Sequence, residues 1–234
     1  MFLEHEQSNE YDRAVYFIFD DRKLIYLVTS KVACTSIKTT LGKAYSIESN
    51  NEMDIHLKDI WNGYRKVEPL PNHYDTYFKF AFVRNPFCRL VSCFRDRVEF
   101  DSNFETYFES NYKLNYKYKI RAGMTFSDFV KTIVTIPHHL ADRHFKSQYA
   151  TLYHNQKCKV DFVGKYESLR EDWAYIANRF DFDPQLPHLN VASASRKKPY
   201  WEYYDQELLA LASEYYKNDI RYFGYEENYD QLSC

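Results

Sequence analysis

Apolar positions fall into short runs rich in β-branched and aromatic residues, which predict strands. Residues 14–20 ("AVYFIFD") and 23–29 ("KLIYLVT") flank the turn-prone pair Asp21-Arg22, so we expect a β-hairpin whose second strand enters the core. Residues 77–83 ("YFKFAFV") and 159–166 ("KVDFVGKY") predict two further buried strands.

A segment that predicts a helix follows each of the last three predicted strands. Residues 36–45 ("SIKTTLGKAY") predict a short helix, with Gly42 as its C-cap or as a break. Pro86 suits the first turn of the next helix. Apolar residues then recur along that helix at helical spacing: Leu90, Val91, Phe94 and Val98.

Capping boxes mark the start of two more helices. Thr125 and Asp128 form one such pair, and Ser168 and Glu171 form the other, after the last strand. Residues 205–220 predict one amphipathic helix near the C-terminus.

The order strand, loop, helix recurs three times, which favours an α/β fold: a three-layer sandwich with a central parallel sheet flanked by helices. No repeat or linker divides the chain, so residues 1–234 are expected to form a single domain. Ligands bind such sheets beyond the carboxyl ends of the strands. We therefore expect residues 30–36, 84–86 and 164–167 to meet at one edge.

The first of these loops, "SKVACTS", is suited to hold an anion. The backbone amides of residues 33–36 lie at the positive end of a helix dipole. Thr35 and Ser36 add hydroxyl donors, and Lys31 adds a mobile charge. The alternative is an ordinary turn with capping hydroxyls. The loop lacks the glycines of GxxxxGK[ST], which argues against a Walker-type ATPase.

The second loop offers another anion site. Arg84 falls at the end of a buried strand, where its guanidinium can grip a phosphate through two hydrogen bonds. Ser92 lies about two turns into the following helix, on the face expected to look back toward the loop. The alternative for Arg84 is an ion pair at a helix end.

Together, "SKVACTSIK" and "FVRNPFCRLVSCFRD" resemble the two cofactor motifs of the family-2 sulfotransferases. That family includes carbohydrate sulfotransferases of the chondroitin 4-O and HNK-1 type and many bacterial relatives. "VDFVGKYESLREDW" and the stretch from "LPHLNVASASRKKPYWEYYDQE" to "YKNDIRYFGY" are similar to its later segments. The resemblance runs in the family's order from about residue 24 to residue 225. Ser30 departs from it, since the family often has proline there.

The resemblance implies the P-loop-like sulfotransferase fold and an enzyme that transfers a sulfuryl group from 3′-phosphoadenylyl sulfate (PAPS) to a carbohydrate hydroxyl. The products would be a sulfated glycan and adenosine 3′,5′-bisphosphate. In the family the first motif grips the 5′-phosphosulfate, with its lysine where the transferring group departs, and the second holds the 3′-phosphate. The cofactor contacts implied here are Lys31, Val32, Ala33, Cys34, Thr35, Ser36, Arg84 and Ser92.

The basic-aromatic stretch "SASRKKPYWEYY" adds Arg196 as a further expected cofactor contact. Tyr200, Trp201 and Tyr203 could stack on adenine or a sugar. A solvated loop is the alternative for this stretch. No metal is expected, because a sulfuryl group carries one less charge than a terminal phosphate.

The acceptor hydroxyl needs a base, and histidine is the natural candidate near neutral pH. His56 ranks first, because related sulfotransferases place a catalytic histidine between the two cofactor motifs. His144 ranks second, since it matches a family histidine followed by an aromatic residue, and His73 ranks third. Glu167 is a further candidate, although its position favours structural pairing. His138, His139 and His144 fit no common zinc spacing.

Charge and composition limit the classes of partner and the cellular location that we expect. The net charge of −2 gives no overall attraction to nucleic acid, and no apolar run nears the roughly 20 residues that span a bilayer, so we expect no stable membrane insertion. The N-terminus is polar, the family's usual Golgi anchor is missing, and five cysteines form no CxxC pair. We therefore expect reduced thiols and a soluble, cytoplasmic protein.

Two other function classes stay open. A non-catalytic carbohydrate- or nucleotide-binding module would use the same loops without chemistry. An ATP-dependent phosphotransferase would need a glycine-rich loop and a magnesium-binding carboxylate after a strand, and neither is clear in the sequence. The identity of the acceptor is not encoded in any residue that we can interpret.

Overall fold

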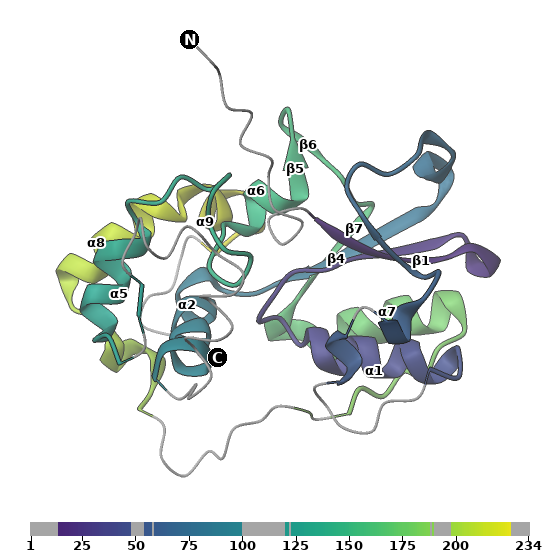
Figure 1. Ribbon diagram of the computed structural model, residues 1–234, viewed down its shortest axis with the longest axis horizontal. Coiled ribbons are helices and arrows are strands. Elements are labelled where there is room, and N and C mark those ends of the chain that lie inside the picture. Colours follow the sequence, from purple (N-terminus) through teal and green to yellow (C-terminus); the bar gives the residue numbers. More distant parts are fainter. Residues whose placement is uncertain are drawn as a thin grey trace.

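The computed structural model describes residues 14–47, 54–57, 59–99, 120–121, 123–187, 189 and 198–225. Their centre is a five-stranded sheet of order β3-β1-β2-β4-β7, and a separate hairpin joins β5 to β6 (Figure 1). The strands are β1 (Val15–Phe19), β2 (Leu24–Leu27), β3 (Arg65–Val67), β4 (Phe78–Val83), β5 (Tyr153–His154), β6 (Lys157–Cys158) and β7 (Phe162–Lys165).

The sheet is mixed. β2, β4 and β7 run parallel, whereas β1 is antiparallel to both β2 and β3. The α/β class and the hairpin of residues 14–29 are confirmed, but the sheet is parallel in three strands only. The reason is the short connection between β1 and β2: a three-residue turn, Asp20–Arg22, closed by Lys23 at φ 47°. A turn of that length permits only an antiparallel return.

Helices cover both faces of the sheet and complete the three expected layers (Figure 1). α1 (Cys34–Ala44) and α7 (Leu169–Phe180) bury Ile37, Leu41, Trp173 and Ile176 against one face. α6 (Gln148–Leu152) and α9 (Lys217–Phe223) bury Leu152 and Phe223 against the other. A further helical cluster lies beside the sheet and consists of α2 (Pro86–Phe94), α5 (Phe126–Ile133) and α8 (Gln206–Tyr215).

Several helix boundaries differ from the sequence pattern. Gly42 lies inside α1, where a Cβ would come within 3.3 Å of Ile55, so the glycine serves close packing and neither caps nor breaks the helix. Ser168 makes no capping bond to the backbone and instead donates to Asp172 at 2.6 Å. Thr125 caps α5 as expected, accepting from the Asp128 amide. The single helix expected over 205–220 is two helices that meet at Tyr216.

α2 continues into a π-helical turn, Arg95–Glu99. The apolar stripe predicted for this helix is buried throughout, including Val98 within the π-helical turn. Burial of Val98 sets the orientation of this turn, and so determines which of its other side chains face away from the core.

The cysteines depart from the expected reduced state at one position. Cys34, Cys93 and Cys158 are free thiols, but Cys88 is disulfide-bonded. Within the described ranges, no helix is both long enough and apolar enough to cross a bilayer. The cytoplasmic location stays a prediction.

Gly164 of β7 provides a test of the packing between strand and sheet face. A Cβ at this position would lie 2.5 Å from Cε1 of the buried Phe82 ring. Because a buried ring has little room to shift, we expect Gly164→Ala to lower the free energy of unfolding by about 1–3 kcal/mol in urea titrations. The double variant Gly164→Ala/Phe82→Leu should lose less than the sum of the single changes. If the losses of unfolding free energy from the two single changes simply add in the double variant, contact with the Phe82 ring is not the cause of the destabilisation.

Candidate active site

A large cleft of about 1930 Å³ opens at the carboxyl edge of the parallel strands. Its walls include the loops after β2, β4 and β7, as the sequence predicts, and also Arg143, His144, Lys146 and Tyr200. Most of the predicted site residues line it: Lys31, Ala33, Cys34, Thr35, Ser36, His56, Arg84, Ser92 and His144. Val32 is fully buried in the core beneath the loop, and Arg196 lies outside the described residues.

The first loop adopts a strained conformation without glycine. Lys31 and Ala33 have φ values of 67° and 58°, in the left-handed region that L-residues rarely adopt. When left-handed residues alternate with ordinary ones, successive backbone amides point toward one concave side of the loop. A concave set of amides is suited to bind an anion. The N-cap of α1, Ala33, offers no side-chain acceptor to the first amides of that helix. Those amides lack intrahelical partners and are suited to bind a phosphate.

Arg84 lies directly beside this loop. Its side chain is buried, and its Nη1 donates to the carbonyl oxygen of Lys31 at 3.4 Å. Nη2 donates to the Tyr200 hydroxyl at 3.0 Å, and the guanidinium lies 4.1 Å from the centre of the Tyr166 ring. The buried Nε has no hydrogen-bond partner within the described part of the chain. An orphaned buried donor of this kind fits a ligand with anionic oxygens.

Tyr200 sits between two guanidinium groups. Arg84 lies 5.4 Å from its ring centre and Arg95 lies 4.8 Å from it. Arg95 also donates to the Tyr203 hydroxyl and to the Lys198 carbonyl, so it anchors the segment that carries Tyr200. Tyr203 packs on Phe126 in the helical cluster, while Trp201 is exposed. Tyr200 is therefore the aromatic residue of the trio that faces the cleft.

Two buried side chains fix the cleft edge. Gln148 accepts from the Arg84 amide at 2.9 Å and donates to the Arg84 carbonyl at 2.8 Å. Arg89, on α2, donates to the carbonyl oxygens of Ser30, Arg143 and Lys146, each at 2.9 Å. Arg89 thus ties the first loop to the segment that carries His144.

Glu167 has a structural role at the same edge. One carboxylate oxygen accepts from the Asn85 amide at 2.7 Å, and the other accepts from the Tyr225 hydroxyl at 3.0 Å. Asn85 in turn caps α2 through the amides of Phe87 and Cys88. Glu167 therefore holds the start of α2 in place.

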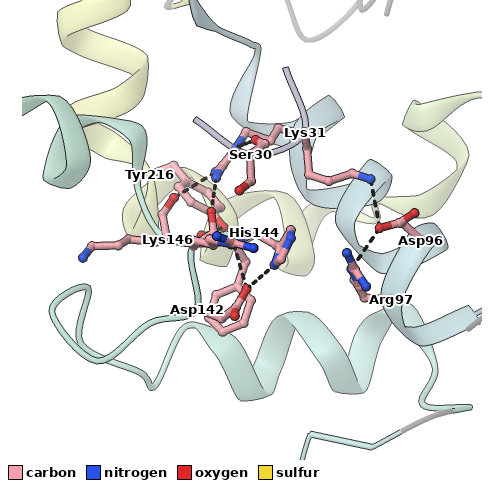
Figure 2. Close-up of polar contacts among 11 residues, drawn as sticks. Ser30, Lys31, Asp96, Arg97, Asp142, His144, Lys146 and Tyr216 are labelled. Atoms are coloured by element: carbon pink, nitrogen blue, oxygen red, sulfur yellow. Dashed lines mark hydrogen bonds and ion pairs between the residues drawn. The ribbon is translucent and has the colours of Figure 1, made fainter. Parts of the chain in front are cut away.

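The Lys31 ammonium is paired with an acid inside the cleft (Figure 2). Asp96 Oδ2 lies 3.1 Å from Lys31 Nζ and 3.0 Å from Arg97 Nε. Burial opposes ionisation of Asp96, but the charges of Lys31 and Arg97 hold the pKa of this carboxyl below its ordinary value. The π-helical turn after α2 presents both Asp96 and Arg97 to the cleft.

His144 forms a buried dyad with Asp142. Asp142 Oδ1 accepts from the His144 amide and from Nδ1, both at 2.7 Å. Burial lowers the pKa of His144, and the Asp142 carboxylate offsets only part of this. The proton on Nδ1 leaves the lone pair of the neutral ring on Nε2. In Figure 2 the His144 ring lies between Asp142 and the cluster of Lys31, Asp96 and Arg97.

His56 lies beside the start of α1, where it contacts Thr35 and Lys38. Lys38 Nζ donates to its Nδ1 at 3.2 Å, and its Nε2 lies 3.0 Å from Thr35 Oγ1. Burial, followed by the charges of Lys38 and Arg143, lowers the pKa of His56 to about 3. The ring is therefore neutral at pH 7, with its proton on Nε2 because Lys38 donates to Nδ1.

Among the other described histidines, His73, His138, His139 and His154 do not line the cleft. His73 is exposed and contacts the Tyr74 ring in a tilted arrangement, and His138 Nε2 lies 3.1 Å from the Tyr215 carbonyl oxygen. Within the described ranges, no group of three or more His, Cys, Asp or Glu side chains is placed to hold a metal ion.

Among the charged cleft residues that the sequence reasoning missed are Lys38, Arg95, Asp96 and Arg97. It also missed Asp142, which contacts the candidate base His144. Asp142 could have been found from its spacing, two residues before His144. Lys38 lies three residues after Thr35, which places both on one face of α1. Asp96 and Arg97 carried no such signal, because their direction depends on the π-helical turn.

Comparison with known proteins decides the family. A model of the sulfotransferase family matches residues 15–226. The chain belongs to the sulfotransferase family. Among curated relatives, it is 25% identical to carbohydrate sulfotransferase 10 of Xenopus laevis over 96% of this chain and 71% of that protein. It is 25% identical to carbohydrate sulfotransferase 10 of Homo sapiens, covering 96% of this chain and 70% of that protein. It is 29% identical to carbohydrate sulfotransferase 11 of Rattus norvegicus, covering 91% of this chain and 68% of that protein.

No solved structure gives a significant match. For this sulfotransferase, the family resemblance and the α/β class expected from the sequence are therefore confirmed by the family match and the fold.

The buried neutral His56 should make stability depend on pH. The unfolded chain protonates this histidine near 6.5, whereas the folded protein does so only near 3. Its contribution to stability is complete above pH 6.5 and is lost as the pH falls, by up to about 1.4 kcal/mol per pH unit. We expect His56→Gln to flatten the fall in unfolding free energy between pH 7 and pH 4, measured by urea titration. Parallel curves for the variant and the parent protein would contradict a buried neutral imidazole.

Proposed function

We propose that this sulfotransferase transfers the sulfuryl group of PAPS to a carbohydrate hydroxyl. The observation that carries the proposal is the contact between the two predicted anion sites: Arg84 donates to the carbonyl of Lys31. One doubly phosphorylated nucleotide can therefore reach both. The names of the relatives, carbohydrate sulfotransferases 10 and 11, favour a sugar acceptor.

In this proposal the first loop holds the phosphosulfate end of the donor. The amides from Val32 to Ser36 and the hydroxyls of Thr35 and Ser36 bind its oxygens. Lys31 leaves Asp96 and neutralises the negative charge that develops on the leaving phosphate oxygen. Charge stabilisation of this kind, together with positioning, supplies most of the catalysis in such transfers.

The 3′-phosphate would lie against the second loop. Arg84 offers its orphaned Nε, and Ser92 lines the same cleft. Tyr200 provides an aromatic face beside Arg84. Arg196 stays a proposed phosphate contact from the adjoining segment.

The geometry favours His144 as the base. Its Nδ1 proton is held by Asp142, so Nε2 can accept the proton of the acceptor hydroxyl. The acceptor oxygen forms a bond to sulfur as the bond between sulfur and the bridging phosphate oxygen breaks. The Asp142 carboxylate then stabilises the imidazolium. His56 is less suited to this role, because Lys38 occupies its Nδ1 and its Nε2 proton faces Thr35.

The rest of the assignment stays a proposal. We expect a glycan acceptor, a cytoplasmic location, no nucleic-acid partner and a single domain over residues 1–234. The metal-free mechanism is proposed because the residues above supply the charge that the transfer requires.

Ligand binding separates this function from its alternatives. We expect adenosine 3′,5′-bisphosphate to raise the melting temperature, whereas ATP with magnesium should not. Calorimetry should show that Arg84→Ala weakens the bisphosphate by at least about tenfold, because a charge-assisted hydrogen bond is lost. Lys31→Ala should abolish transfer. Lys217→Ala, an exposed charge on α9, is the matched control.

Stabilisation by ATP with magnesium alone would favour a phosphotransferase. Bisphosphate binding without transfer to any hydroxyl compound would favour a binding module. Unchanged affinity in Arg84→Ala would contradict the assignment of the second loop.

The base assignment predicts a pH profile. On its acid side, transfer should be constant from pH 7 down to about 6.5 and should fall only well below it, because the pKa of His144 is lowered by burial. We expect His144→Asn to abolish this acid limb along with most of the activity. Asp142→Asn should lower kcat by about 100-fold or more, since the ring loses its orientation. A His144→Asn enzyme that keeps the parent profile would exclude this base.

A further inference from the structure

A buried lysine lies below the first loop of the cleft. Lys38 is only 7% exposed, yet it lines the cleft one helical turn after Thr35. Its ammonium donates to His56 Nδ1 at 3.2 Å and lies 5.1 Å from the centre of the Phe17 ring. A charge buried this deeply is costly unless its contacts repay the loss of water. The burial indicates a role that an apolar residue could not fill.

The two hydrogen bonds of His56 have a fixed direction. An ammonium has no lone pair, so the bond between Lys38 and Nδ1 must run from lysine to histidine. The neutral ring then carries its proton on Nε2 and donates it to Thr35 Oγ1 at 3.0 Å. Because the Thr35 oxygen accepts this bond, its own proton points away from His56. The Thr35 hydroxyl can therefore donate only to a group other than His56.

We propose that Lys38 and His56 are positioning residues that aim the Thr35 hydroxyl as a donor to the transferring end of the nucleotide. This inference rests on the proposed function and assigns to His56 a role other than that of base. Thr35 is the binding residue, and the other two act through it.

The surrounding structure supports a fixed relay. Thr35 and Lys38 lie on one face of α1, since residues three apart on a helix are neighbours. The short turn Asp54–His56 is locked by the buried Ile55, whose carbonyl accepts from the Trp61 indole at 2.8 Å. Neither partner therefore depends on an exposed, mobile side chain.

Burial, together with the charges that face the relay, lowers the pKa of His56 and keeps its ring neutral. The imidazole faces Lys38, Arg143, His144 and Arg97, all of which disfavour its protonation. Lys38 faces Arg143 and Arg65, and Cys34 acts in the opposite sense; burial lowers the pKa of Lys38 to about 8. At pH 7 the lysine is mostly charged and the histidine is uncharged, which maintains the direction of both bonds.

A double-mutant cycle tests the relay. The variants are Thr35→Val, Lys38→Met and His56→Gln, singly and in pairs, with kcat and KM for PAPS measured from pH 5 to pH 9. We expect each single change to lower kcat/KM for PAPS by about tenfold, because each removes the same aimed hydrogen bond. The pairs should lose no more than the singles, since the three residues act as one unit.

Three controls separate positioning from general damage. Thr35→Ser keeps the hydroxyl and should retain most of the activity. Lys43→Met removes an exposed charge from the same helix and should leave kcat/KM unchanged. Thermal melting of every variant checks folding. The acid limb of the pH profile should persist in His56→Gln, because the inferred base is His144.

Additive losses in the pairs would overturn the relay, as would loss of the acid limb in His56→Gln, which would make His56 the base. If Lys38→Met does not fold, the cycle of Thr35→Val and His56→Gln decides in the same way. An unmodified enzyme that transfers no sulfate at all would instead overturn the proposed function.

Discussion

Parallel pairing of β2 with β4 is the constraint on which the site depends. Tyr26 pairs with Phe80, so the two strands end at the same edge and release their loops side by side. The buried guanidinium of Arg84 then reaches the carbonyl of Lys31. Without this pairing the two loops would be separate anion sites of little specificity. With it, they form one surface that matches a nucleotide charged at both ends.

Keeping a cationic cleft folded requires internal compensation, because like charges repel and buried charges lose water. Asp96 provides part of it by forming ion pairs with both Lys31 and Arg97. Aromatic faces provide another part: Tyr166 and Tyr200 cover Arg84. The net charge of the chain is only −2, so the attraction for an anionic donor is a local property of this cleft. The two histidines near it differ through their neighbours, a carboxylate for His144 and an ammonium for His56.

Local patterns predicted much of this arrangement. The strand ends, the first loop and Arg84 were found because each depends on residues close in sequence. Features set by distant contacts could not be found in this way. The antiparallel edge follows from a turn too short for a crossover, and the failed cap at Ser168 follows from its bond to Asp172. The ranking of the histidines depends on Lys38 and Asp142, whose roles are visible only once the loops are placed. The disulfide state of Cys88 was likewise not predictable from cysteine spacing.

The central claim is that one nucleotide contacts both loops at once. Its most direct test is calorimetric comparison of adenosine 3′,5′-bisphosphate with adenosine 5′-monophosphate, two ligands that differ only in the phosphate assigned to Arg84. The account predicts that the monophosphate binds at least about tenfold more weakly, through loss of charge-assisted hydrogen bonds. Equal affinities for the two nucleotides would contradict it.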